Sequence, residues 1–482
     1  MRPKRAAVGR GPLLFESSEE KNSDRDGEGG TSHGSVGTQP KLGITEQGVW
    51  QLAWPTMAAM GAGTVVRFTD FVMVRDLGPS ALAAVGVGGQ FYWFIESLGA
   101  IAPGGLAAIL ARAVGAGDRS LADASFRQAH LLGAVLAVLG CVMLFPFTRV
   151  AIGFYGVESD VVDLGSEYLW WRLWGTLPLS VAMIFGTALR AAGDVRTPLH
   201  AGVVAAVVNM FFNWVLIHGN LGAPAMGVKG AALASNIALV VMAAHFLILW
   251  RSKNLVLQPG SGSWRPDLDL QKRLLRIGIP SGTESGLFQL GLMLFQRIMS
   301  PFGTNVIAAY NVGSMLLGFS FIPGVAFSMA ASTLVGQNLG AKRPDRAEQE
   351  GWRSNKIAIL TMTALGAVLV FGARPIAGMF FDEPEAIDLC VMALEILGAA
   401  HPFMAVEFAL GGALRGAGDT LFPMITVFTG LVVVRLGMAS GLVYFFDAGV
   451  QAVWAVLVVD YLSKSMMFVA RFRGGKWKRR EV

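Results

Sequence analysis

Charged side chains are scarce in this sequence: Asp, Glu, Lys and Arg make up 15% of its 482 residues, against about 25% in ordinary soluble domains. Only two cysteines occur, Cys141 and Cys390, both inside apolar runs, so no disulfide framework and no CxxC metal site can form. The six histidines show no metal-ligand spacing, and HExxH, GxSxG and P-loop motifs are missing. These absences argue against a membrane enzyme, and we expect no cofactor and no protein-bound metal centre.

Apolar surface is what the sequence has in abundance. Hydrophobic residues make up 53% of the chain, and a mean hydropathy of +0.53 is more than one globular core could hide from water. The net charge of +6 gathers at the ends of apolar segments, which indicates membrane orientation rather than a nucleic-acid surface. We therefore expect an all-α integral membrane protein whose partner is the lipid bilayer, with no nucleic-acid partner.

A two-fold internal repeat organises the chain. Pro55 and Pro280 are 225 residues apart (280 − 55 = 225). The same offset carries the motif ALRAAGD, which starts at Ala188, onto ALRGAGD, which starts at Ala413 (413 − 188 = 225). In so apolar a chain a two-fold repeat is typical of transporters, because an alternating-access cavity forms naturally between two related halves.

The length of the apolar segments predicts how often the chain crosses the membrane. A helix needs roughly 20 apolar residues to cross about 30 Å of hydrocarbon. The repeat offset maps the first six such segments onto the last six, and since six is even, both halves enter the membrane in the same direction. The sequence thus predicts two six-helix bundles related by a parallel repeat, with twelve transmembrane helices at about residues 51–74, 87–111, 124–146, 163–189, 198–218, 228–250, 275–300, 307–335, 355–373, 386–414, 421–445 and 449–470.

The loops predict the orientation of these spans. Lys and Arg concentrate after the even-numbered spans and at the C-terminus, whereas the opposite loops carry little more than Arg75, Arg149 and Arg374. The positive-inside rule therefore places both termini in the cytoplasm of a cell that carries the protein in its plasma or inner membrane.

Composition also divides the chain into five parts. Residues 1–45 are predicted to form a disordered cytoplasmic tail, because the stretch from Ser17 to Gly37 has almost no large apolar side chain to offset the entropy of ordering. The remaining boundaries follow from the spans and the charges: an N-terminal bundle at 46–250, a cytoplasmic linker at 251–274, a C-terminal bundle at 275–470 and a basic cytoplasmic tail at 471–482.

Several segments carry a resemblance to a known family. TDFVMVRDLGPSALAAVGV follows the first span, NMFFNWVLIHGNLGAPAMGVKGAALAS surrounds the turn between the fifth and sixth, GIPSGTES opens the seventh and VGQNLGAKRPDRAE closes the eighth. Together with the paired ALRxAGD motifs, these segments resemble the multidrug and toxic compound extrusion (MATE) family over about residues 45–470. The resemblance implies a twelve-helix antiporter that expels mostly cationic, amphipathic compounds against inward flow of Na⁺ or H⁺.

Within the first half, polar residues in apolar spans are the candidates for ion coupling. Asp70 stands where the family carries a carboxylate, and a charge in hydrocarbon usually faces a cavity, although Asp70 could also be a solvated residue near the outer end. Asn209 and Asn213 share a helix face, either as part of the site or as a link between helices; some relatives have Asp at the second position. Arg67 replaces an Asn common in relatives and, three residues from Asp70, is predicted to act as its counter-ion. This pairing favours coupling to protons over coupling to Na⁺. If Na⁺ is the coupling ion, we expect it to bind near Asp70.

The second half offers Glu284, Gln289 and Glu407. The resemblance implies a carboxylate in the seventh span, where Glu284 and Gln289 lie, and another in the tenth, where Glu407 comes slightly later than in eukaryotic relatives. Either acid could line the cavity or be structural. Among the other charged residues, Asp460 and Lys464 are spaced to pair on one helix face.

Three further expectations follow from arginines and from the whole pattern. Arg172, beside three tryptophans, is predicted to belong to an interfacial aromatic belt, and the arginines of the ALRxAGD motifs to helix ends at cytoplasmic turns. The leading interpretation is a monomeric, ion-coupled antiporter for organic cations. The alternatives are a lipid-linked precursor flippase, whose cavity should be strongly cationic, and a membrane enzyme.

Overall fold

The computed structural model describes residues 42–253, 255–257, 262–480 and 482, which belong to one compact unit that starts at residue 41. The predicted disordered tail therefore lies outside the described residues as far as residue 41, as does part of the predicted linker. Residues 42–45 are described: Leu42 packs against the core of the first half, and the backbone N–H of Thr45 donates to Gln337 Oε1 over 2.8 Å.

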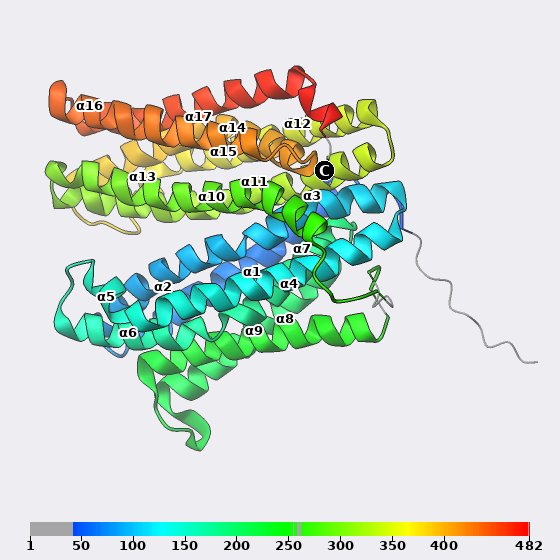
Figure 1. Cartoon of the computed structure of the whole chain (residues 1–482). Coiled ribbons are helices and arrows are strands. Elements are labelled where there is room, and N and C mark those ends of the chain that lie inside the picture. Colours follow the sequence, from blue (N-terminus) through cyan, green and yellow to red (C-terminus); the bar gives the residue numbers. More distant parts are fainter. Residues whose placement is uncertain (1–41, 254, 258–261, 481) are drawn as a thin grey trace, which may run out of the picture. The chain divides into compact units, whose positions relative to one another are not determined.

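The described residues are helical from one end to the other, and the helices match the predicted spans in number and order (Figure 1). Two short helices, α5 (Thr148–Gly153) and α13 (Ala373–Ala377), extend the third and ninth spans. The first half consists of α1 (Val49–Arg75), α2 (Pro79–Gly99) with α3 (Ile101–Ala116), α4 (Arg119–Leu144), α6 (Ser159–Leu173) with α7 (Thr176–Ala191), α8 (Arg196–His218) and α9 (Gly227–Arg251). The second half consists of α10 (Leu268–Met299), α11 (Thr304–Gly340), α12 (Pro344–Phe371), α14 (Pro384–Gly416), α15 (Leu421–Phe428) joined to α16 (Met438–Phe445) by a π-helical segment (Thr429–Gly437), and α17 (Val450–Arg473).

Hydropathy accounts for eleven of the twelve spans. Among the described residues, ten helices are long and apolar enough to cross a membrane, and the pair α6 and α7, bent by 52°, passes the same test together. The remaining span is α10, which is 32 residues long but carries polar side chains such as Ser281, Glu284 and Gln289. The twelve-helix prediction is confirmed, and the weak hydropathy of α10 comes from residues that line the cavity described below.

Each half is a bundle of six spans. In the second half α14 packs against α11, α12 and α17, and in the first α8 packs against α1 and α9 while α4 packs against α3 and α7. The halves differ in where their spans are interrupted: the span made of α2 and α3 breaks at Ala100, and α6 and α7 meet at a bend of 52°. Their repeat mates α11 and α14 are continuous helices. The second half has an interruption of its own, the π-helical segment Thr429–Gly437, where the first half has the continuous α8. The parallel repeat is thus preserved in topology but not in these local details.

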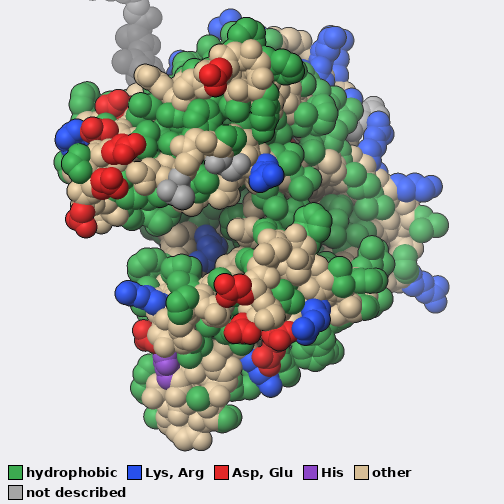
Figure 2. Space-filling model, turned by 90° about the vertical axis from the view of Figure 1, so that its left-hand side faces the viewer, with side chains coloured by type: hydrophobic (Ala, Val, Ile, Leu, Met, Phe, Trp, Pro, Cys, Tyr) green, Lys and Arg blue, Asp and Glu red, His purple; other side chains and the backbone are tan. Residues whose placement is uncertain are grey.

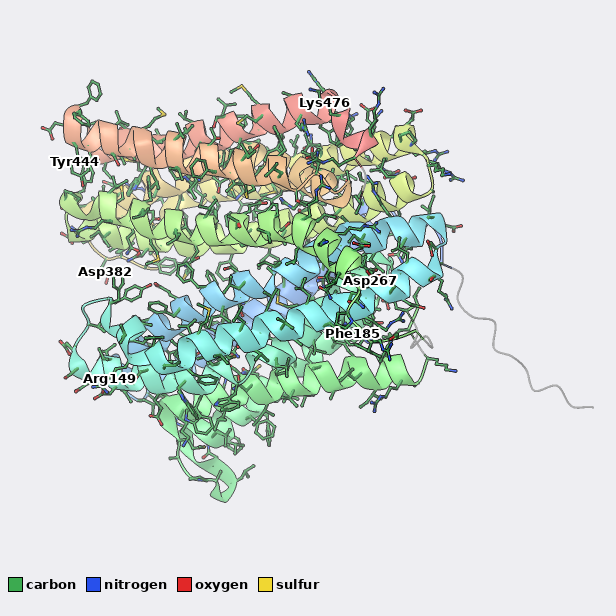
Figure 3. The ribbon with its side chains drawn as sticks, viewed as in Figure 1. Arg149, Phe185, Asp267, Asp382, Tyr444 and Lys476 are labelled. Carbon is green, nitrogen blue, oxygen red and sulfur yellow. The ribbon has the colours of Figure 1, made fainter. Side chains whose placement is uncertain are left out.

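The two ends of the unit differ in charge and in packing. One end, called here the basic end, carries the Lys- and Arg-rich loops, with Asp267 and Lys476 near it; Arg149, Asp382 and Tyr444 lie at the opposite end (Figure 3). At the basic end α3 packs against both α10 and α11 of the other half. Seen from the opposite end, the surface is hollowed between the two halves (Figure 2). The structure is therefore closed at the basic end and open at the opposite one.

Polar contacts reinforce the closed end. Gln337 of α11, fully buried, donates from Nε2 to the carbonyl of Ala191 in the first half (2.8 Å). Arg112 of α3 donates to the carbonyl oxygens of Ala417 and Arg480 in the second half (2.8 Å each). These contacts supply hydrogen bonds to carbonyls at helix ends, which would otherwise lack partners.

The C-terminal segment after α17 is also anchored. Trp477 is buried and stacks on Phe472. Lys478 Nζ lies 2.6 Å from Glu348 Oε2 of α12, and this hydrogen bond raises the pKa of Lys478. The segment predicted as a basic tail thus begins as a packed extension of the second bundle.

Candidate functional site: a central cavity between the two bundles

A cavity lies between the two bundles and is lined by helices of both. Its part nearer the basic end has a volume of about 350 Å³, and the part beyond it has a volume of about 550 Å³. Glu284, Ser285 and Phe408 line both parts, so the two are continuous. The first half contributes α2, α3 and α7, and the second contributes α10, α11, α14, α15 and α17. A volume of this size can hold a drug-sized molecule.

The lining is mostly apolar and aromatic, with a few polar groups. Trp93, Phe288, Phe321 and Phe408 offer ring surfaces, while Gln289 offers an amide. Apolar walls with sparse, fixed polar groups are typical of small-molecule sites. Aromatic faces also attract organic cations through their quadrupoles.

Three carboxylates line the cavity, and two of them are paired within their own bundle. Glu284 Oε1 lies 3.1 Å from Arg415 Nη1. Glu407 Oε2 lies 2.9 Å from Lys464 Nζ. The third, Glu96 of α2, has no cation within ion-pair distance among the residues that the structure describes; Arg172, and more weakly Arg67, act on it at longer range. The first half therefore presents the uncompensated acid.

Glu407 belongs to a buried ionic network. Arg435 Nε donates to Asp460 Oδ2 over 2.8 Å, and Lys464 Nζ lies 3.4 Å from the same oxygen. The side chains of Arg435 and Asp460 are 1% and 0% exposed. The predicted pairing of Asp460 with Lys464 is confirmed, but it is one edge of a larger network that includes Glu407. Two cations against two anions leave this network neutral.

Backbone geometry places Arg435 in this network. Arg435 lies in the π-helical segment Thr429–Gly437. A π-helical turn shifts the phase of the side chains that follow, and such turns are frequent at functional sites. The Arg435 guanidinium also lies over the Tyr461 ring, 5.1 Å from its centroid.

In the first half, the predicted polar residues do meet. Asn213 Nδ2 donates to Asp70 Oδ1 and also to Asn209 Oδ1 over 2.9 Å. Asn209 Nδ2 in turn donates to Ser235 Oγ over 3.3 Å. This series of hydrogen bonds links α1, α8 and α9, and both asparagines are fully buried. Asp70 is thus part of a hydrogen-bonded group inside the first bundle.

The prediction that Arg67 is the counter-ion of Asp70 is wrong. Arg67 is exposed, and its Nη2 donates to Thr64 Oγ1 over 3.0 Å; none of the ion pairs among the described residues joins it to Asp70. The side chain points along the helix surface, because the i, i+3 spacing permits a contact but does not impose it. The cation that interacts with Asp70 is instead Arg172 of α6.

Arg172 also departs from its predicted place in an interfacial belt. Its Nη1 donates to Tyr92 Oη (3.3 Å) and to Asn236 Oδ1 (3.0 Å), and its guanidinium lies 4.1 Å from the centroid of the Tyr92 ring. The side chain therefore points into the first bundle, between α2 and α9. It acts electrostatically on both Asp70 and Glu96.

The arginines of the repeated ALRxAGD motifs are likewise not confined to turns. Arg415 pairs with Glu284, and Arg190, its repeat mate, lines the same part of the cavity. Arg190 Nη2 donates to Thr187 Oγ1 over 3.4 Å and has no carboxylate partner among the described residues. At the position that corresponds to Glu284, the first half has Ala59 (284 − 225 = 59). The aspartates of the two motifs also differ: Asp194 accepts from the backbone N–H of Thr197, as expected of a turn residue, whereas the buried Asp419 is paired with Arg471.

The predicted site residues thus separate into two groups. Glu284, Gln289 and Glu407 line the central cavity. Asp70, Asn209 and Asn213 form the polar group inside the first bundle and do not line either part of it. Among the described residues, no three His, Cys, Asp or Glu side chains gather as metal ligands would. The sequence analysis assigned no role to Glu96. Its position in an apolar span was the feature that could have indicated a functional carboxylate.

A twelve-span α-helical unit with a central cavity between two repeat-related bundles defines a polytopic membrane transporter. Comparison with known proteins agrees. The model of the MatE family matches the chain twice, at residues 55–215 and 280–439, once in each half. The protein belongs to the MatE (multidrug and toxic compound extrusion) family.

Curated relatives and solved structures extend along nearly the whole chain. The chain is 29% identical over 440 residues to a probable multidrug resistance protein NorM of Thermotoga maritima, covering 90% of this chain and 93% of that protein. It is 25% identical to a protein of the same name from Mesorhizobium japonicum, over 89% and 93% of the two chains. Its fold is similar to a MOP superfamily transporter from Pyrococcus furiosus (TM-score 0.85, 21% identity, 93% and 100% covered). Its fold is also similar to that of an outward-facing multidrug resistance MATE transporter (TM-score 0.83, 22% identity, 89% and 96% covered).

Proposed function

We propose that the protein is an ion-coupled antiporter that exports amphipathic, mostly cationic small molecules through the central cavity. The observation that carries this proposal is the free carboxylate of Glu96, which faces an apolar, aromatic cavity while the two other acids there are paired. An uncompensated negative charge in a low-dielectric site favours a cation. The names of the NorM relatives, probable multidrug resistance proteins, support a broad range of substrates.

The experiment is efflux of matched fluorescent compounds, one cationic and one neutral, from proteoliposomes that contain the full chain. Glu96→Gln should lower transport of the cation about tenfold or more, since a charge-assisted contact is worth roughly 1.5–3 kcal/mol, and should change transport of the neutral compound little. Glu385→Gln is the matched control, because Glu385 is exposed at the start of α14 and lies outside the cavity. Equal losses for both compounds would refute a charge-selective role.

For the coupling ion we favour H⁺ over Na⁺, with Asp70 as the group that takes up the proton. Asn213 presents its amide N–H₂ to Asp70, so an N–H donor, and not an oxygen ligand for Na⁺, lies beside this carboxylate. The absence of a second acid at position 213 argues against a relay of two carboxylates, so Asp70 would act alone. Proteoliposomes with an imposed pH gradient or an imposed Na⁺ gradient test this choice directly. Transport that follows the Na⁺ gradient alone would refute it, and Asp70→Asn should abolish coupling to either gradient.

We also propose that the basic end faces the cytoplasm of a plasma or inner membrane, as the positive-inside rule requires. Single cysteines at Ser263 and at Gly222, in loops at the two ends, should then react with an impermeant reagent from opposite sides of the membrane. Reaction of both from the same side would overturn the orientation.

A lipid-linked precursor flippase remains the second candidate, and Arg190 is the observation that favours it. In the part of the cavity nearer the basic end, Arg190 and Arg415 face the single carboxylate of Glu284. A flippase would use such positive charge to hold a pyrophosphate. Arg190→Gln should leave cation efflux intact if the protein is a drug antiporter, and should abolish translocation of a fluorescent polyprenyl pyrophosphate if it is a flippase.

A further inference from the structure

A groove at the basic end gathers four arginines. A cavity of about 580 Å³ lies between the first turns of α10, the start of α15 and the segment after α17. Among the described residues that line it, none carries a carboxylate side chain. The arginines come from α10 and from the C-terminal segment: Arg273, Arg276, Arg479 and Arg480. The site is separate from the central cavity, with which it shares no lining residue.

The repeat supplies an internal comparison for this groove. A cavity of equal volume, about 580 Å³, occupies the corresponding place in the first half. The repeat mates of Pro280 and Gly418, which are Pro55 and Gly193, line it. There Gln51 stands at the position of Arg276 (276 − 225 = 51). The excess of positive charge is therefore not a by-product of the fold, because the described lining of the corresponding groove in the first half has a single arginine, Arg196, together with the acidic Asp194.

Two of the four arginines are available to a ligand. Arg273 donates to the main-chain oxygen of Val482, and Arg480 lies 3.7 Å from Asp419 Oδ1. Arg276 and Arg479 are exposed, and no carboxylate lies within ion-pair distance of either in the part of the chain that the structure describes. Asp419 itself is already held by Arg471 at 2.8 Å. Glu481, outside the described residues, is the one further acidic residue of the C-terminal segment.

An apolar stripe runs from the groove toward the middle of the membrane. Leu421, which lines the groove, is followed on α15 by Ile425 and Phe428, and their exposed fractions are 44%, 43% and 45%. Residues at i, i+4 and i+7 lie on one face of a helix. In a membrane-spanning bundle an exposed apolar stripe of this kind contacts lipid chains. The groove thus joins a cationic pocket at the membrane surface to an acyl-chain path.

We propose that this groove binds an anionic phospholipid, with the headgroup phosphate between Arg276 and Arg479 and an acyl chain along Leu421, Ile425 and Phe428. Arginine forks match phosphate oxygens in geometry and charge. Basic pockets between transmembrane helices at the membrane surface are well suited to such headgroups. The apolar stripe favours a lipid over free inorganic phosphate, because inorganic phosphate has no acyl chain to contact the stripe. This site is independent of the transported substrate.

The test uses the purified full-length protein in phosphatidylcholine nanodiscs that contain a fraction of fluorescent phosphatidylglycerol. Energy transfer from protein tryptophan to the labelled lipid reports binding, with labelled phosphatidylcholine as reference. The wild type should prefer the anionic lipid, and R276Q/R479Q should lower that preference about 30-fold, since each arginine near the surface contributes about fivefold. R343Q/R346Q removes the same charge from exposed positions at the same end and should preserve the preference.

A second pair of measurements distinguishes the source of the phosphate. I425Q/F428Q should weaken binding of the lipid while the arginines remain. Inorganic phosphate, added as a competitor at constant ionic strength, should not displace the lipid. The proposal is overturned if the wild type shows no preference for the anionic lipid, if R343Q/R346Q loses the preference as fully as R276Q/R479Q, or if phosphate displaces the lipid and I425Q/F428Q binds it normally.

Discussion

Gly115 and Gly340 should control how tightly the basic end closes. They are repeat mates (340 − 115 = 225), and each lies against the backbone of the opposite half. A Cβ on Gly115 would lie 2.7 Å from the Cα of Gln337, and a Cβ on Gly340 would lie 2.8 Å from the Cα of Arg112. Such distances are well below van der Waals contact, and backbone cannot rotate away as a side chain can. Alanine at either position must therefore separate α3 from α11.

The size of the effect follows from the cost of overpacking. Inserting a methyl group into a well-packed interface costs about 1–3 kcal/mol, which corresponds to roughly a 5- to 160-fold change in an equilibrium constant. The cost falls on the state shown here, closed at the basic end, and is relieved when the halves move apart there. Gly115→Ala should thus shift the population toward conformations open at the basic end without unfolding either bundle.

Distances between spin labels at Ser120 and Arg343 can measure this shift. Both positions are exposed at the basic end, close to the two glycines in sequence, and the native Cys141 and Cys390 can be replaced beforehand. Gly115→Ala and Gly340→Ala should add a population at longer distance. Gly318→Ala is the control, because this glycine of α11 has open space around it. Distance distributions identical in Gly115→Ala and Gly318→Ala would refute the proposed role of the glycine contact.

Four other substitutions test the ionic groups. Asp460→Asn should destabilise the folded protein by about 3–5 kcal/mol, because it leaves Arg435 buried without its anion; a thermal unfolding midpoint equal to wild type would contradict this. Arg172→Gln should move the pH profile of transport to more alkaline values, since a carboxylate that loses a nearby cation takes up a proton more readily. Arg67→Gln should shift the profile less, because Arg67 acts on Glu96 more weakly than Arg172 does. Lys478→Gln should cost less than about 1 kcal/mol. The pKa of Lys478 is raised by its ion pair, so this small stabilisation should be present below its unfolded pKa, near 10.5, and should disappear as the pH rises through the folded value.

Sequence alone determined the architecture. The 225-residue repeat and the length of the apolar runs predicted twelve spans in two bundles, because the thickness of hydrocarbon sets how many apolar residues a span needs. They also included α10 as a span, at residues 275–300, and the repeat offset pairs it with α1. Polar residues on one helix face, such as Asn209 and Asn213, were correctly predicted to act together, because a helix fixes which side chains share a face.

Only the tertiary structure decided which charges meet. Spacing along one helix suggested Arg67 as the partner of Asp70, but the cation that acts on Asp70 comes from another helix, at Arg172. Likewise Arg415 belongs to Glu284, more than a hundred residues away in sequence. Glu96 is the free acid of the cavity only because its two neighbours there are paired. A local pattern fixes the face on which a side chain lies, whereas the partner across that face depends on how separate helices pack.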